Sequence, residues 1–204
     1  MIEKVKGTSN LDKIAAEIGF LACDIYKAIC SILSEQKDTF KDKDYAKFKD
    51  KEVPSIISKI QEKLKINNKN FVESIFSKVI LERIESNRDR EKAFKNLINN
   101  LPKFDPKELE RVINKALGIL IEDGLFAYAI WLESEGKDAH KLLELSSLKL
   151  LKDVGVISSE QNNLRDATLN KISTSIEKTM LARQLLERML VYARYRAKAI
   201  QKGE

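Results

Sequence analysis

Residues that make turns are scarce in this sequence. Its 204 residues include only 7 glycines and 3 prolines, which is too few for the closely spaced turns of a β-sandwich. No run of alternating apolar and polar residues is long enough to predict a strand. Apolar residues make up 43% of the chain and recur at helical spacing. The sequence therefore predicts an all-α fold, a helical bundle of about six to eight helices with a long C-terminal helix.

Histidine and cysteine are equally scarce, which limits the available chemistry. His140 is the only histidine, so a zinc site or a histidine-activated nucleophile would depend on it alone. Its neighbours are charged, and we expect it at the solvated start of a helix. Cys23 and Cys30 lie roughly 10 Å apart along one predicted helix, too far for a disulfide bond, so we expect two buried, reduced thiols. The scattered glycines form no phosphate-binding loop. We expect no catalytic residue, no metal site and no cofactor, and hence no enzyme.

Long apolar runs are missing as well. Nowhere do about 18 apolar residues follow one another, as a membrane-spanning helix requires. The first six residues lack the apolar stretch of a signal peptide. Together with the reduced thiols, these features lead us to expect a soluble, cytoplasmic protein without membrane contact.

Apolar periodicity divides the chain into predicted helices. The first begins near Ser9 or Asn10 and carries one apolar stripe as far as Leu33. Later helices are predicted at 54–64, 71–84, 93–101, 106–120, 125–132, 138–155 and 164–201. The clearest start is Asp105-Pro106-Lys107-Glu108, which combines an aspartate cap, a proline in the first turn and a glutamate at the reciprocal position.

The stretch from residue 36 to residue 53 departs from this pattern. It is dense in charge and keeps only three large apolar side chains, those of Phe40, Tyr45 and Phe48. We expect a mobile charged linker here, with room for a short helix. The chain as a whole, 1–204, is predicted to be a single α-helical domain, with 54–104 and 105–204 as candidate sub-lobes.

The helix predicted at 125–132 is apolar almost all round. Such a helix has no face for water. We therefore expect it to be buried on every side at the centre of the fold, with Trp131 mostly buried.

The last predicted helix has a strongly basic face. Residues 183–204 hold six basic and two acidic residues, a net charge of +4 out of the chain's +6. Projection at about 100° per residue separates an apolar face from a face with these candidate nucleic-acid-binding residues: Arg183, Arg188, Arg194, Tyr195, Lys198 and Lys202. Such a row could follow a phosphate backbone and stack a base. Cations near a helix C-terminus also complement the helix dipole and keep the surface soluble, so both interpretations stay open.

Three stretches carry a resemblance to a known family. Residues 121–136 (IEDGLFAYAIWLESEG) form an apolar helix between two glycines, and residues 139–143 (AHKLL) follow it with an Ala-x-x-Leu-Leu turn. The closing helix contains LARQLLE at 181–187 and YARYRA at 192–197. Together these stretches resemble the small helical subunit of the type III-B CRISPR–Cas (Cmr) RNA-targeting effector complex. The likeness covers the C-terminal half and the first helix, with residues 36–100 as an insertion or a divergent region.

The resemblance implies a non-catalytic structural subunit of a ribonucleoprotein complex. Several copies would stack side by side and support bound guide and target RNA in antiviral defence, while neighbouring subunits cut. The implied partners are the other subunits of that complex, copies of the chain itself, and RNA. Two alternatives remain open: a helical protein–protein adaptor with no nucleic-acid role, and an enzyme that supplies only part of an active site in an assembly.

Overall fold

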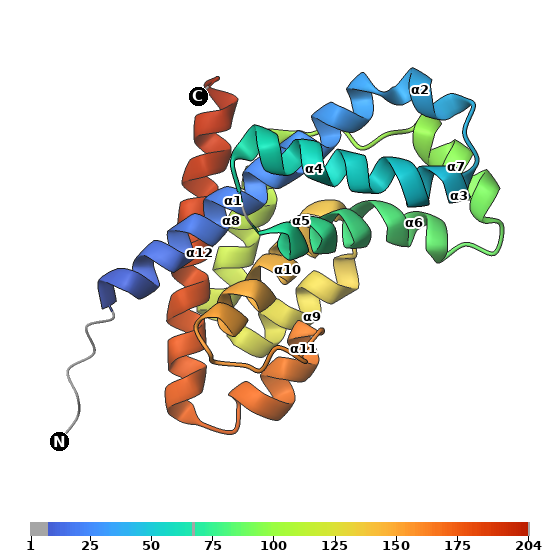
Figure 1. The fold of residues 1–204 in the computed structure, drawn as a ribbon. Coiled ribbons are helices and arrows are strands. Elements are labelled where there is room, and N and C mark those ends of the chain that lie inside the picture. Colours follow the sequence, from blue (N-terminus) through green and yellow to red (C-terminus); the bar gives the residue numbers. More distant parts are fainter. Residues whose placement is uncertain (1–7, 67, 204) are drawn as a thin grey trace. The chain divides into compact units, whose positions relative to one another are not determined.

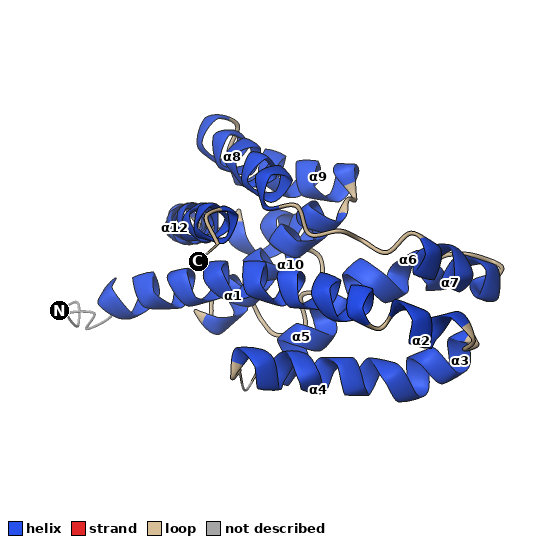
Figure 2. Cartoon of the chain, turned by 90° about the horizontal axis from the view of Figure 1, so that it is seen from above, coloured by secondary structure: helices blue, strands red, loops and turns tan. Residues whose placement is uncertain are grey.

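The computed structural model describes residues 8–66 and 68–203, and these form helices and loops without a strand (Figures 1 and 2). The all-α prediction is confirmed. Two compact units are present: the split unit, Met1–Cys23 with Asp105–Glu204, and the inserted unit, Asp24–Phe104. Their division falls within the first helix, α1 (Thr8–Glu35). The sub-lobe boundary predicted between residues 104 and 105 coincides with this division, but the first part of α1 belongs with the C-terminal half.

The split unit is built around the last helix. Besides the first part of α1 it contains α8 (Pro106–Glu122), α9 (Leu125–Glu135), α10 (Asp138–Asp153), α11 (Leu164–Ala167), the π-helical turn η3 (Thr168–Ile172) and α12 (Ile176–Gln201). The α12 helix packs mainly along α8, while α9 lies against α10 and α8. The predicted start of α8 is confirmed, because the Asp105 carboxylate accepts hydrogen bonds from the backbone N–H groups of Lys107 and Glu108 at 2.9 and 3.3 Å.

The inserted unit consists of short helices. Besides the rest of α1 it contains α2 (Lys37–Lys41), α3 (Tyr45–Lys47), the π-helical turn η1 (Phe48–Glu52), α4 (Val53–Leu64), α5 (Lys69–Phe76), the π-helical turn η2 (Ser77–Leu81), α6 (Glu82–Glu85) and α7 (Arg90–Asn99). The α4 helix packs on α5, whereas α2, α3 and α6 each contact α7.

The expected linker at 36–53 is instead helical, since α2, α3 and η1 occupy it. Phe40 and Phe48 are fully buried, and their rings lie 5.2 Å apart. The ring of Phe94, from α7, lies 4.9 Å from that of Phe48. Tyr45 is buried as well, and its hydroxyl donates a 2.8 Å hydrogen bond to Glu85. These aromatic side chains make the segment part of the core of the inserted unit.

The expectation that residues 125–132 are buried on every side is wrong. The buried residues of α9 are Leu125, Tyr128, Ala129 and Leu132, the spacing of an ordinary amphipathic helix. Phe126 and Ile130 are 43% and 41% exposed. Trp131 is only partly exposed and its indole Nε1 is buried, so the prediction that this residue is mostly buried is confirmed. Its ring lies 4.7 Å from that of His140 and 5.3 Å from the Lys115 ammonium. Apolar composition alone therefore overstated the burial of this helix.

The helix predicted at 164–201 is interrupted after Ile172. Ser175 caps the N-terminus of α12, where its hydroxyl accepts a 3.3 Å hydrogen bond from the backbone N–H of Lys178. The serine and threonine side chains at 173–175 compete with the backbone for hydrogen bonds and so favour a break. At 26 residues, α12 is shorter than α1, which has 28.

Candidate nucleic-acid interface

The α12 helix is amphipathic, and this positions the candidate residues. Its buried side carries Ala182, Leu185, Leu186, Met189, Leu190, Ala193, Ala197 and Ile200. These residues recur at spacings of three and four, so one side of the helix faces α8 and α10. The apolar face predicted for this helix is confirmed. None of the six candidate residues is buried.

The first part of α1 approaches α12 at very short range. At Gly19, a Cβ atom would lie 2.6 Å from the backbone O of Met189 and 3.0 Å from the backbone N of Ala193. The Cys23 thiol lies 3.6 Å from the backbone O of Ala193. Only a residue without a side chain lets the two helices come this close. Cys23 and Cys30 are both buried, as predicted.

Two candidate arginines have partners within the split unit. Arg183 Nη2 donates a 2.6 Å hydrogen bond to the backbone O of Ile121, one of the last carbonyls that α8 leaves unbonded. Arg188 Nη1 lies 3.6 Å from Asp12 Oδ1, and the other oxygen of Asp12 accepts a 2.8 Å hydrogen bond from the Tyr192 hydroxyl. This hydrogen bond raises the pKa of Tyr192. These contacts fasten α12 to α8 and to α1.

Lys198 shares a carboxylate with a neighbouring amide. Its Nζ lies 3.3 Å from Glu110 Oε1, on α8, while Gln201 Nε2 donates a 2.8 Å hydrogen bond to Glu110 Oε2. The hydrogen bond from Gln201, followed by the contact with Lys198, lowers the pKa of Glu110. Glu110 is therefore ionised at neutral pH and offsets part of the positive charge of this face.

The remaining three candidates are Arg194, Tyr195 and Lys202. The Arg194 guanidinium lies 5.2 Å from the centre of the Tyr195 ring, a cation–π distance. Tyr195 is 54% exposed, so one face of its ring remains available for stacking. Lys202 is exposed at the C-terminal end of α12, where a cation also complements the helix dipole.

The candidate residues thus divide into two groups, one that could contact RNA and one that contacts neighbouring helices. Arg194, Lys198 and Lys202 follow one another at four-residue intervals, about 6 Å apart along the helix, and Tyr195 lies beside them. This group could contact successive phosphates and stack a base. Arg183 and Arg188 lie nearer the N-terminus of α12 and hold it against its neighbours.

Sequence reasoning missed the acidic partners of this face. Asp12 precedes its α12 partner Tyr192 by 180 positions, and Glu110 precedes its partner Gln201 by 91. Asp12 lies on α1 and Glu110 on α8, and each directly follows a leucine of the apolar stripe predicted for its helix. That position is the only signal in the sequence, and it does not identify the partner.

His140 is not at a solvated position, contrary to expectation. Only 3% of its surface is exposed, and its Nδ1 is buried without a hydrogen-bond partner among the described residues. On α10, residue 140 shares a helix face with the buried Leu143, Ser147 and Leu151. Its position on this buried face, rather than the charge of its sequence neighbours, determines the burial of His140. Burial lowers the pKa of His140.

Two kinds of site are absent from residues 8–66 and 68–203: metal-ligand clusters and membrane spans. Within these residues, His, Cys, Asp and Glu side chains form no group of three that could hold a metal ion. No helix in this part of the chain combines the length and the apolar character needed to cross a bilayer. The chain matches no known protein family, no curated protein and no solved structure.

Proposed function

We propose that this chain is a non-catalytic structural subunit of a type III-B CRISPR RNA-guided effector complex and that α12 supports the bound RNA. The location of the three resembling stretches carries this proposal. Residues 121–136, 139–143 and 181–197 all belong to the split unit, together with the first part of α1. The rest of the chain up to Phe104 forms a unit of its own, as expected if a segment had been inserted into a smaller ancestral domain.

The existing ion pairs of α12 leave its cations available to a polyanion. Arg188 and Lys198 are 48% and 49% exposed in their pairs with Asp12 and Glu110. Exposed pairs of this kind contribute only about 0–1 kcal/mol each. A phosphate that replaces such a carboxylate therefore costs little stability, and each phosphate contact also releases counterions from the RNA.

RNA binding by the triple variant Arg194→Gln, Lys198→Gln, Lys202→Gln tests the role of α12. Glutamine removes each charge without adding a carboxylate opposite Glu110. We expect the slope of log affinity against log salt concentration to fall by about two units for single-stranded RNA, with affinity weakened alike for all sequences because phosphate contacts read no bases.

The matched control carries Lys59→Gln, Lys63→Gln and Lys69→Gln. These exposed lysines of α4 and α5 give the same change in net charge on the inserted unit. The control should keep the wild-type slope, and both variants should keep a native circular-dichroism spectrum. Equal slopes for the two triple variants would remove α12 from the RNA-binding hypothesis.

Membership in an RNA-guided complex is tested by affinity purification from native cells. We expect nuclease-complex subunits and a guide RNA to co-purify with the wild-type chain at moderate salt. Recovery of protein partners without any RNA, at the same salt concentration, would contradict the proposal.

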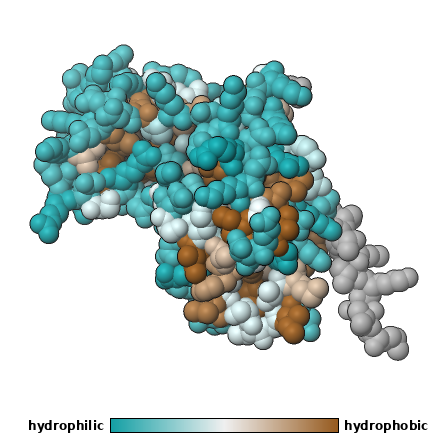
Figure 3. All heavy atoms as spheres, turned by 180° about the vertical axis from the view of Figure 1, so that it is seen from behind, coloured by the Kyte–Doolittle hydropathy of each residue, from teal (hydrophilic) through white to brown (hydrophobic). Residues whose placement is uncertain are grey.

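A second candidate, a protein–protein adaptor with no nucleic-acid role, is favoured by exposed apolar side chains. In the split unit these include Ile121, Phe126, Ile130, Leu169, Ile176 and Met180, and Figure 3 shows apolar side chains at the surface among hydrophilic ones. Apolar side chains that form a contiguous exposed patch are typical of surfaces that bind other proteins. Under this alternative, Phe126→Ser with Ile130→Ser would abolish partner recovery, and the α12 triple variant would not affect it.

A further inference from the structure

Exposed apolar side chains are concentrated in the split unit. Among residues 8–66 and 68–203, every large apolar side chain that is exposed belongs to this unit, and the inserted unit contributes none. Several of them lie where α8 ends and where α9 and α12 begin, and we call this set the corner surface: Ile121, Phe126, Ile130, Ile176 and Met180. Their exposed fractions range from 41% for Ile130 to 76% for Ile176.

Antiparallel packing of α8 and α12 brings these side chains to one end of the split unit. Arg183 donates a hydrogen bond to the backbone O of Ile121, and Gln201 donates one to that of Pro106, at the other end of α8. The end of α8 therefore lies beside the first turns of α12, where Met180 precedes Arg183 by about 4.5 Å along the helix axis. The α9 helix follows α8 directly and contacts both α8 and α12. The corner surface thus combines the ends of three packed helices.

The spacing of the corner surface suits a helical partner. Ile176 and Met180 lie four residues apart on α12, and Phe126 and Ile130 have the same spacing on α9. Residues four apart form a ridge on one side of a helix, about 6 Å from one to the next. Such ridges pack into the grooves between the side chains of another helix. An extended peptide would need a strand edge to pair with, and residues 8–66 and 68–203 contain no strand.

The charges beside the corner surface are acidic. Residues 116–136 include acidic residues but neither lysine nor arginine. Glu122 and Asp123 are exposed and form no ion pair with any residue that the structure describes. Glu177, in the first turn of α12, accepts a hydrogen bond from the Ser175 hydroxyl, which lowers the pKa of Glu177 and keeps it ionised at neutral pH. Cations at the rim of a partner would complement these carboxylates.

The basic residues of α12 nearest to the corner surface do not cancel this charge. Arg183 is hydrogen-bonded to the Ile121 carbonyl, which neutralises part of the α8 C-terminal dipole instead of a carboxylate. Lys178 is two positions from both Ile176 and Met180, about 200° around the helix. It therefore lies on the opposite side of α12 from the corner surface.

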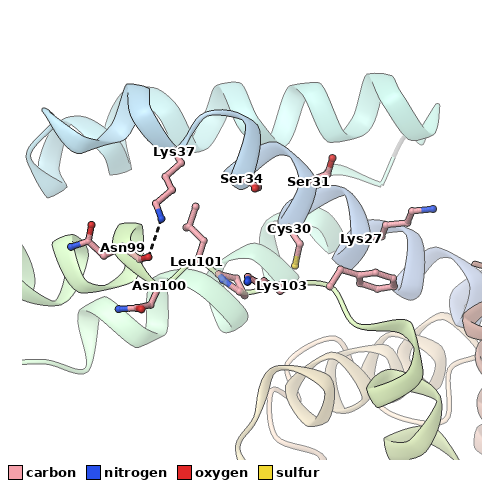
Figure 4. A pocket seen from close by; sticks show the side chains of 11 residues that line it. Lys27, Cys30, Ser31, Ser34, Lys37, Asn99, Asn100, Leu101 and Lys103 are labelled. Atoms are coloured by element: carbon pink, nitrogen blue, oxygen red, sulfur yellow. Dashed lines mark hydrogen bonds between the residues drawn. The ribbon is translucent and has the colours of Figure 1, made fainter. Parts of the chain in front are cut away.

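A groove in the inserted unit lacks a comparable match of shape and charge. It measures about 680 Å³ and lies between α1 and residues 99–104. Lys27 and Lys37 on its α1 side are about 15 Å apart along the chain, and Figure 4 shows Lys37 reaching across to Asn99 while the Lys27 nitrogen points away. The lysines of this groove therefore do not converge on one anion.

We propose that the corner surface binds a basic amphipathic helix of another protein. The apolar row of that helix packs against the corner surface, and its lysines or arginines contact Glu122, Asp123 and Glu177. A second copy does not supply the helix, because the basic helix of this chain, α12, already buries its own apolar face. The inference does not rest on RNA binding by α12. The two are distinguished directly, since the α12 triple variant should bind a basic helix as the wild type does.

Fluorescence anisotropy of labelled peptides with the full chain tests the class of partner. The probe is a peptide of about 18 residues, long enough to form a helix, with leucines at helical spacing and lysines elsewhere. One control peptide has glutamates in place of the lysines, and another has the probe's composition in scrambled order. The probe should bind at least about tenfold more tightly than either control, and added salt should weaken its binding. Equal affinity for the probe and either control peptide would overturn the proposal.

The double variant Phe126→Ser, Met180→Ser tests the apolar part of the surface. Truncation of central apolar anchors should weaken binding of the probe by at least about tenfold. The matched control, Phe20→Ser with Leu181→Ser, removes exposed apolar side chains of the same unit outside the corner surface and should bind as the wild type does. Both variants should keep a native circular-dichroism spectrum. Equal losses in the two variants would contradict the assignment.

The double variant Glu122→Gln, Asp123→Asn tests the acidic part. Because exposed charge pairs contribute little each, we expect binding to weaken by about threefold to tenfold and its salt dependence to become shallower. The control Glu62→Gln, Asp50→Asn makes the same change in net charge at exposed positions of the inserted unit and should leave binding unchanged; an equal effect of the two pairs would overturn the proposal.

Sedimentation of the wild type and of Phe126→Ser, Met180→Ser tests the competing occupant. Both should have the same oligomeric state. A wild-type dimer that this variant dissociates would assign the corner surface to a second copy of the chain and overturn the proposal.

Discussion

Replacing Gly19 by alanine tests the packing of the split unit most directly. The added Cβ atom would lie 2.6 Å from the backbone O of Met189 and 3.0 Å from the backbone N of Ala193. Both contacts are with helix backbone, which cannot rotate away as a flexible side chain can. The first part of α1 and α12 must therefore move apart.

The expected change in stability combines one stabilising effect with two destabilising ones. Alanine is favoured over glycine in a helix interior by about 1 kcal/mol. Overpacking of a well-packed contact costs about 1–3 kcal/mol, and the upper end applies here because neither backbone can yield alone. The helix separation also weakens the edge-to-face contact of Phe20 with Tyr192, at 5.9 Å, which contributes about 0.5–1.5 kcal/mol. We expect the free energy of unfolding of the split unit to fall by about 2–3 kcal/mol.

Urea unfolding monitored by tryptophan fluorescence measures this change. Trp131 is the only tryptophan and lies in the split unit, so its signal reports that unit. The matched control is Gly118→Ala in α8, where a Cβ atom would meet no atom within 4 Å; helix propensity alone should then raise stability by about 0.5–1 kcal/mol. If Gly19→Ala stabilised the protein as much as Gly118→Ala does, the close crossing of α1 and α12 would be refuted.

Two further predictions concern a buried histidine and the aromatic core of the inserted unit. Burial holds the pKa of His140 below its usual value, so its contribution to stability is fully present above a pH of about 6.5 and declines as the pH falls toward the lowered pKa of the folded state. The variant His140→Gln should lose this decline in urea unfolding between about pH 7.5 and pH 5, and an unchanged pH slope would contradict the assignment. Phe48→Ala should lower the stability of the inserted unit by about 3–5 kcal/mol in unfolding followed by circular dichroism. The exposed neighbour Asp50→Ala should change it by less than about 0.5 kcal/mol, and similar values for the two variants would restore the interpretation of residues 36–53 as a linker.

Helix positions could be predicted where local sequence decides them. Asp105-Pro106 predicts the start of α8 because an aspartate cap and a proline act within one turn. The segment at 36–53 could not be predicted in this way. Its charges are local, whereas the residues that anchor it, Glu85 and Glu91 among them, follow Tyr45 by 40 and 46 positions.

For the candidate interface too, the sequence predicts the positions of residues along a helix but not their contacts with other helices. Helical periodicity places Arg194, Lys198 and Lys202 on one side of a helix, and the structure has them off the buried side of α12. The acidic partner of Lys198, Glu110, depends on which helix packs alongside α12, and periodicity does not encode that.

The discontinuity of the split unit determines the order in which it can fold during synthesis. Cys23 and its contact Ala193 are 170 positions apart. At about 5–20 residues per second, the ribosome needs roughly 10–30 s to make the intervening chain. The inserted unit is continuous, so it can fold while α12 is still being made. Throughout that interval Gly19 and Cys23 of α1 have no α12 to pack against, and the neighbouring Ala15, Ile18 and Ala22, which are buried in the complete chain, lack the finished split unit. A nascent chain of this design therefore exposes apolar surface on α1 until α12 has been made.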